Sequence, residues 1–177
     1  ALRPSGRQGR VRRRFLSAVT PEGLSFCTET AAAVCGRVYV LEDSYGLAPA
    51  LLQRVLEQAL QLGQTCLVCY TPLQPDGAPA HLLVPGAGAA FVASSPDFPY
   101  AGERCCTLEL DGTLPPAARD TLHFARDTVG TLLRKAAEHV REAKRIHDEL
   151  EALCRPYVDF AAADALAERT LHELFPT

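Results

Sequence analysis

Apolar residues in the first half of the chain form short runs separated by turn signals and by one helix-length segment. Residues 37–41 read Arg-Val-Tyr-Val-Leu, a β-branched and aromatic run that predicts a buried strand. Residues 49–62 place apolar side chains at helical spacing and end just before Gly63, a common helix terminator. Residues 65–70 predict the next strand. A strand, a helix and a strand at this spacing predict a parallel pair joined by a right-handed crossover.

Three further short strands are expected downstream. Prolines at positions 72, 75 and 79 predict an irregular loop, after which residues 81–84, 89–93 and 105–110 form apolar or alternating runs. With the segments described above, this pattern predicts an α/β fold with a small parallel sheet over residues 14–115.

The C-terminal third predicts helices alone. Residues 116–155 contain no helix breaker except Gly130, and a second helical pattern covers residues 159–175 after Pro156. Apolar positions of the first helix follow steps of three and four, which gives a narrow stripe: Leu122, Val129, Leu133, Ala136, Val140, Ala143, Leu150 and Cys154. Such an apolar stripe is expected to pack against another apolar surface. We therefore expect an antiparallel helical hairpin over residues 116–177, packed on the α/β domain and with Val140 buried.

Charge is distributed unevenly. The first fourteen residues hold six arginines and no acid, which leaves −9 for the remainder of a chain whose net charge is −3. Residues 1–13 are therefore expected to form a basic linker or arm. Nucleic acid is not the favoured partner, because the arginines lack the interleaved aromatics of a single-strand binding surface. A nucleic-acid-binding adaptor acting through this arm remains an alternative.

Composition narrows the class of protein. A chain of 177 residues that is 47% hydrophobic and 22% charged can bury a globular core. No long apolar run or signal peptide is visible, so we expect a cytoplasmic protein without a membrane partner. The chain contains no methionine and begins at Ala1, which leads us to expect a processed or trimmed form or one half of a longer protein.

Seven cysteines occur, mainly in apolar stretches, and are expected to be buried free thiols. Cys66 and Cys69 have the spacing of a redox or zinc motif. On a strand, however, positions three apart point to opposite faces, so neither role is expected.

The turn after residues 37–41 is the place where chemistry is most strongly indicated. A strand, a glycine-containing loop and a helix start together form the usual cradle for phosphate. An intact cradle reads Gly, four residues, Gly-Lys-Ser/Thr: the glycines let amides converge, the lysine reaches the outer phosphates and the hydroxyl binds magnesium. This chain instead reads Glu42, Asp43, Ser44, Tyr45, Gly46, Leu47, Ala48, Pro49 and Ala50.

Several segments resemble the second half of a bacterial family of tandem P-loop ATPases. The opening is Arg-Phe-Leu-Ser-Ala-Val-Thr-Pro-Glu-Gly at residues 14–23, and the strand before the loop is Val-Tyr-Val-Leu at residues 38–41. Residues 72–76, 81–85, 143–151 and 157–160 are similar to later blocks of that family. The resemblance implies a P-loop NTPase-like fold, with ATP and magnesium as the family's ligands. It also implies a catalytic P-loop half, in the same or another chain, as a partner.

Carried over by that resemblance, the two motif glycines fall on Asp43 and Ala48, the lysine on Pro49 and the hydroxyl residue on Ala50. The only glycine left in the loop is Gly46. Together with Ser44, Tyr45 and Leu47, these residues form a vestigial phosphate loop. Pro49 removes an ammonium group and an amide donor, and the acidic side chains place negative charge where phosphate binds. We therefore expect no bound cofactor and a non-catalytic regulatory or assembly role.

An active ATP-dependent enzyme or phosphotransferase with an altered loop remains the main alternative. Other candidates are weaker. His139 and His147 lie about 12 Å apart along one helix, too far to chelate one metal ion. Asp148, Glu149 and Glu151 are interpreted as a solvated helix face. No serine or cysteine has a general base visible in the sequence, so no catalytic residue is assigned.

Overall fold

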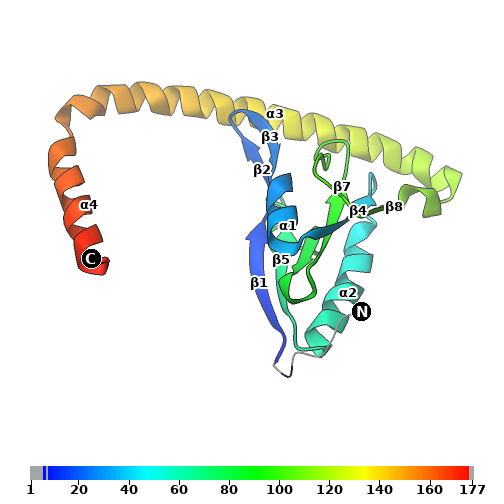
Figure 1. Cartoon of the computed structure of the whole chain (residues 1–177). Coiled ribbons are helices and arrows are strands. Elements are labelled where there is room, and N and C mark those ends of the chain that lie inside the picture. The colour runs from blue at the N-terminus through cyan, green and yellow to red at the C-terminus, as the bar shows by residue number, and fades with distance from the viewer. Residues whose placement is uncertain (1–5, 7, 176–177) are drawn as a thin grey trace. The chain divides into compact units, whose positions relative to one another are not determined.

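The computed structural model describes residue 6 and residues 8–175 (Figure 1). Its main sheet has six strands in the order β1-β5-β6-β7-β4-β8. Pairing is parallel except at β6, which is antiparallel to both of its neighbours. The strands are β1 (Arg10–Phe15), β4 (Arg37–Glu42), β5 (Thr65–Tyr70), β6 (His81–Val84), β7 (Ala89–Ser94) and β8 (Cys106–Glu109). The expected α/β class is therefore confirmed.

Helices and a small hairpin complete the secondary structure. Strands β2 (Ser17–Thr20) and β3 (Gly23–Phe26) pair antiparallel as a separate two-stranded sheet. The helices are α1 (Thr28–Cys35), α2 (Ala48–Gln61), α3 (Pro116–Cys154) and α4 (Phe160–Leu174). Short 3-10 turns occupy Pro85–Ala87, Asp111–Thr113 and Arg155–Tyr157. The expected strands at 37–41, 65–70, 81–84 and 89–93 and the helices at 49–62 and 116–155 are thus present, with small shifts at their ends.

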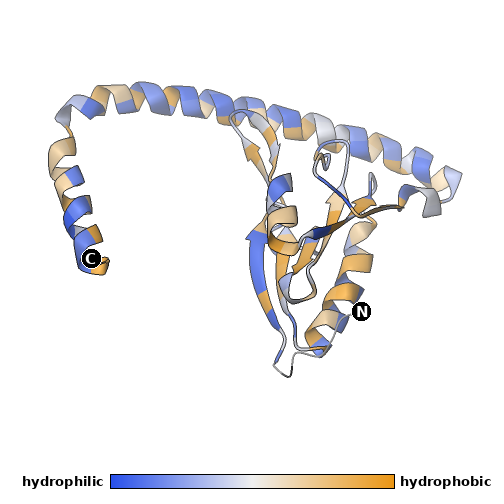
Figure 2. Cartoon of the chain, in the orientation of Figure 1, coloured by the Kyte–Doolittle hydropathy of each residue, from blue (hydrophilic) through white to orange (hydrophobic). Residues whose placement is uncertain are grey.

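The chain divides into two compact units, residues 1–140 and residues 141–177, and α3 runs through the boundary. We call the first the sheet unit and the second the C-terminal unit. The sheet unit contains the core, which lies on both faces of the main sheet. Helix α1 covers one face over Val38, Val40 and Leu83, whereas α2 covers the other over Leu41 and Val68. Figure 2 shows hydrophobic residues concentrated on these strands and on α2.

The expected pairing of β4 with β5 is wrong. Strand β4 pairs with β7 and β8, while β5 pairs with β1 and β6. The connection through α2 therefore passes two intervening strands, β6 and β7. Local periodicity predicts that a crossover occurs, but it does not fix how many strands the crossover spans.

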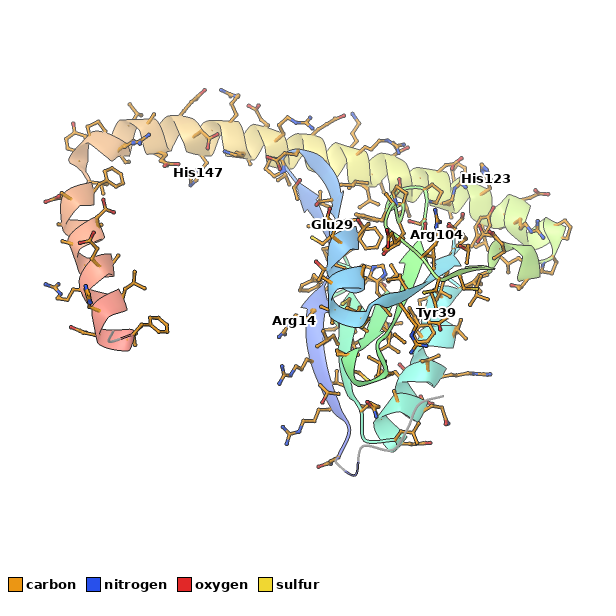
Figure 3. The ribbon with its side chains drawn as sticks, viewed as in Figure 1. Arg14, Glu29, Tyr39, Arg104, His123 and His147 are labelled. Carbon is orange, nitrogen blue, oxygen red and sulfur yellow. The ribbon has the colours of Figure 1, made fainter. Side chains whose placement is uncertain are left out.

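The interpretation of residues 1–13 as a linker is also wrong for residues 10–13, because they belong to an edge strand. Residues 10–15 form β1, which pairs in parallel with all six residues of β5, and the Arg10 amide donates to the Gln64 carbonyl at 3.2 Å. Residues 1–5 and 7 lie outside the described residues. All six side chains of β1 are exposed, Arg14 among them (Figure 3). An edge strand can carry arginines because its backbone pairs on one side while the guanidinium groups stay in water.

Helix α3 packs on the sheet unit along residues 118–137, where its buried and half-buried residues lie. Gly130, Leu133 and Ala137 are its buried residues, and Val140 is 36% exposed, so the expected burial of Val140 is wrong. Every residue from 138 to 175 is exposed, and α4 buries no side chain. The antiparallel helical hairpin is therefore not confirmed. Within residues 8–175 no helix is long and apolar enough to cross a membrane.

Candidate functional site

The loop at residues 43–50 lies between two buried elements. It follows β4, whose Val38, Val40 and Leu41 are almost fully buried, and it leads into α2, which is anchored by Ala48 and Leu52. Asp43, Ser44, Tyr45, Gly46 and Leu47 form the connection, whereas Ala48, Pro49 and Ala50 make the first turn of the helix. The eight residues predicted from the sequence thus lie in a strand–loop–helix turn.

The Asp43 side chain folds back onto the amides of its own loop. Its Oδ1 accepts hydrogen bonds from the amides of Leu47 at 2.8 Å and Tyr45 at 3.3 Å, and its Oδ2 accepts one from Ala48 at 2.7 Å. The residue is only 7% exposed. A carboxylate thus binds the amides at the start of α2, where the helix dipole favours negative charge. This is the interaction that a bound phosphate would make.

A second carboxylate binds the loop from a distant segment. The Ser44 amide donates to Asp111 Oδ1 at 2.8 Å, across 67 positions of sequence. The Asp43 amide donates to the Ser94 carbonyl at the end of β7. The amides of residues 43, 44, 45, 47 and 48 are therefore all used within the protein. From the sequence, Asp43 was interpreted as a negative charge that repels phosphate. The contact with Asp111 was not predicted, because no local pattern links that residue to the loop.

The remaining loop residues complete this arrangement. Gly46 adopts a φ of 78°, a left-handed conformation that disfavours other residues, so the glycine is required by the turn. Pro49 occupies the second helical position, where its missing amide costs nothing. Glu42 lies near Arg104, with 3.7 Å between their charged atoms. The loop is thus a stable turn without a lysine.

A cavity of about 430 Å³ lies beside the loop, within the sheet unit. It is bordered by residues 43–46 after β4, residues 71–73 after β5 and residues 95–98 after β7, with α3 residues from 122 to 133 on the other side. These three strands are mutually parallel, so their carboxyl ends meet at one edge of the sheet. Ligands of α/β proteins commonly bind at such an edge.

The two cysteines with motif spacing lie on opposite sheet faces. Cys66 packs in the cluster under α2 and Cys69 in the cluster under α1, as the strand geometry predicts. Burial raises the pKa of each thiol to about 11, which keeps both protonated at neutral pH. A neutral thiol is a poor nucleophile and a poor metal ligand, so these residues act as core side chains.

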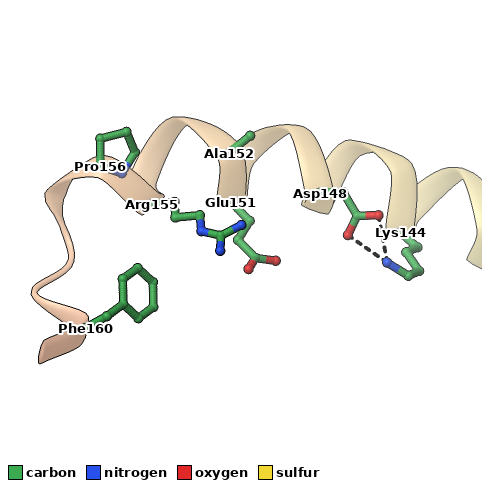
Figure 4. A pocket seen from close by; sticks show the side chains of 7 residues that line it. All are labelled: Lys144, Asp148, Glu151, Ala152, Arg155, Pro156 and Phe160. Carbon is green, nitrogen blue, oxygen red and sulfur yellow. Dashed lines mark hydrogen bonds and ion pairs between the residues drawn. The ribbon is translucent and has the colours of Figure 1, made fainter. Parts of the chain in front are cut away.

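The C-terminal unit has a groove where α3 gives way to α4 (Figure 4). Lys144 Nζ pairs with Asp148 at 2.7 Å, and the Arg155 guanidinium lies 5.8 Å from the Phe160 ring centre. His147, Asp148 and Glu151 place possible metal-ligand atoms within 4.8 Å of one another, but all three side chains are exposed. Exposed groups of this kind are common without a metal, and the exposure of Asp148 and Glu151 agrees with their interpretation as a solvated face.

The chain matches no known family model, no curated protein and no solved structure. Its resemblance to tandem P-loop ATPases therefore stays a hypothesis. The geometry of the loop is the stronger guide to function.

Proposed function

We propose that this chain is a degenerate P-loop NTPase-like domain, the non-catalytic regulatory or assembly half of a tandem ATPase protein. The observation that supports this proposal is the Asp43 carboxylate, which accepts three amide hydrogen bonds at the start of α2. A nucleotide phosphate would need the same donors. The loop is therefore closed by a group that belongs to the protein.

The energetics favour the closed loop over a bound nucleotide. Phosphate entry would remove the amide partners of Asp43, and a hydrogen bond to a charged group contributes about 1.5–3 kcal/mol. The displaced carboxylate would also lie beside a like charge, which costs roughly 4 kcal/mol at a separation near 4 Å in a partly wet site. Pro49 and Ala50 supply neither an ammonium group nor a magnesium-binding hydroxyl to offset these costs.

The partner implied by the proposal is a catalytic P-loop half with an intact lysine, in the same or another chain. The proposal places the protein in the cytoplasm. All seven cysteines are free, and reduced thiols are the usual state in that compartment.

Calorimetric titration of the chain with MgATP tests the proposal directly. We expect no binding tighter than about 100 μM, a threshold that corresponds to roughly 5.5 kcal/mol. Tighter binding, accompanied by amide chemical-shift changes at residues 46–51, would instead support an active enzyme with an altered loop. Titration with MgGTP under the same conditions extends the test to the other common nucleotide.

A nucleic-acid-binding role is the second candidate, and one observation favours it. Side chains alternate along a strand, so Arg10, Arg12 and Arg14 share one face of β1. Arg10 and Arg12 line a groove of about 820 Å³ that has no acidic residue in its lining. Binding of a single-stranded oligonucleotide that weakens steeply with salt, and is lost when Arg10 and Arg12 are both replaced by alanine, would support this role.

A further inference from the structure

The cavity beside the vestigial loop has a lining that is mostly apolar. Val19, Leu73 and Phe98 border it from the sheet side, and Leu122, Val129 and Leu133 border it from α3. Leu73 is 58% exposed and Val129 is 49% exposed, so both side chains have apolar surface in contact with water. A ligand that covered this surface would gain roughly 25 cal/mol for each Å² removed from water.

Three polar side chains around the cavity already accept hydrogen bonds within the protein. Asp43 accepts three amide hydrogen bonds, and the Ser95 hydroxyl oxygen accepts one from the Phe98 amide at 3.2 Å. The Thr71 hydroxyl oxygen accepts one from the Gln74 amide at 3.2 Å. These three side chains therefore do not need a ligand as a hydrogen-bond donor.

Charge around the cavity disfavours an anion. Two carboxylates, Asp43 and Asp97, border it against one guanidinium, Arg126. Arg126 is itself bound to Asp127, with 2.6 Å between Nη2 and Oδ1, and Asp97 lies 3.6 Å from Arg134. The one cation in the lining is thus already paired, and the net charge of the lining is negative.

We propose that this cavity binds a small uncharged molecule with an aromatic or branched aliphatic body. Its volume of about 430 Å³ lies within the range of small-molecule sites, about 300–1,000 Å³, which are typically apolar with few polar groups. The inference goes beyond the proposed function, because it needs only the cavity and not the P-loop ancestry. A ligand here would contact both the loop and α3.

Fluorescence titration with N-phenyl-1-naphthylamine, an uncharged probe that brightens in apolar surroundings, tests the site on the full chain. We expect saturable binding with one probe per chain. Ala125 borders the cavity and is exposed, so Ala125→Trp fills the space without entering the core. This substitution is expected to weaken binding at least tenfold. Val129→Phe fills the same space and serves as a second variant if Ala125→Trp fails to fold.

Leu171→Ser in α4 is the matched control, because it removes an exposed apolar side chain elsewhere. It should leave probe binding unchanged, and 1-naphthyl phosphate, an anionic analogue, should bind at least tenfold more weakly than the uncharged probe. The proposal is overturned if binding does not saturate, if both cavity-filling variants bind normally, if Leu171→Ser abolishes binding or if the anion binds equally well. The proposed function is tested by the MgATP titration and the cavity by the fluorescence titration, so the failure of one proposal can be told apart from the failure of the other.

Discussion

Asp43 Oδ2 accepts a 2.7 Å hydrogen bond from the amide of Ala48, the residue that begins α2. The bond spans five positions and links the end of a buried strand to the start of the helix that follows. By the carried-over motif, both residues stand where an intact phosphate loop has glycine. Under the proposed P-loop ancestry, the residue that replaces the first glycine is the one whose carboxylate binds the amides.

Asp43→Ala should destabilise the sheet unit. The change leaves the amides of Tyr45, Leu47 and Ala48 without their acceptor, and loss of comparable helix caps and charged hydrogen bonds costs about 2–4 kcal/mol. Asp43→Asn keeps one oxygen acceptor and should cost less, about 1–2 kcal/mol. Urea unfolding monitored by circular dichroism measures both values.

Asp76→Ala is the control for the Asp43 variants. Asp76 pairs with Arg13, but its side chain is 88% exposed, and such pairs contribute about 0–1 kcal/mol. If Asp43→Ala proves no more destabilising than Asp76→Ala, the carboxylate does not hold the loop together. The support for a closed phosphate loop would then be lost.

Gly9→Ala should destabilise the chain because β1 begins against α2. A Cβ at position 9 would lie 2.4 Å from the carbonyl oxygen and 2.7 Å from the Cα of Leu60, so the backbone must shift. Overpacking of this kind costs typically 1–3 kcal/mol. At Gly112 a Cβ meets nothing within 4 Å, and Gly112→Ala should change the melting temperature little. Equal melting temperatures for the two variants would contradict this close contact.

Leu133→Asp should unfold the sheet unit, whereas Val140→Asp should not. Leu133 is 5% exposed, and an unpaired charge there has no partner to offset its desolvation. Val140 is much more accessible, so its replacement should cost below about 1 kcal/mol. Both variants are compared by thermal unfolding. A folded Leu133→Asp protein would show that α3 contributes little to the core.

Most elements of the sheet unit are predictable because their apolar residues are local in sequence. Residues 37–41 and 65–70 are mostly apolar and include β-branched and aromatic residues, and residues 49–62 have apolar side chains at helical spacing. Strand β1 is different, because its four arginines do not give the apolar pattern of a strand. Its backbone instead pairs with β5, a distant segment. Strand order likewise depends on contacts that no local pattern encodes.

The turn at residues 43–50 was predicted from the sequence, and its role as a site stays a prediction. The strand–loop–helix pattern locates residues 43–50, because it depends on local signals. The hydrogen bonds from the loop amides to Asp43 depend on a side-chain geometry that only the folded loop defines. The hydrogen bond between Ser44 and Asp111 joins distant parts of the chain. The cavity is also assembled from five separated segments. The apolar stripe on α3 predicted that the helix has a buried surface. It did not predict that the last buried residue of the helix is Ala137.

His81 should make stability depend on pH. The ring is buried, its Nδ1 accepts a hydrogen bond from the Ala93 amide at 3.1 Å, and it stacks on Phe26 with 5.0 Å between ring centres. Burial lowers the pKa of His81 from 6.5 to about 4, because the folded protein disfavours the charged ring. The unfolded chain therefore binds more protons than the native state between these two values.

It follows that the contribution of His81 to stability is fully present above pH 6.5 and is lost as pH falls through 4. The linked change is roughly 3 kcal/mol over this window. His81→Gln keeps an oxygen that can accept from the Ala93 amide but removes the titration. The variant should be less stable at pH 7 yet show a shallower loss of stability between pH 6.5 and 4, measured by urea unfolding at several pH values. Parallel pH profiles for the two proteins would contradict this prediction, because they would mean that the pKa of His81 does not change on folding, as for a ring that is accessible to water.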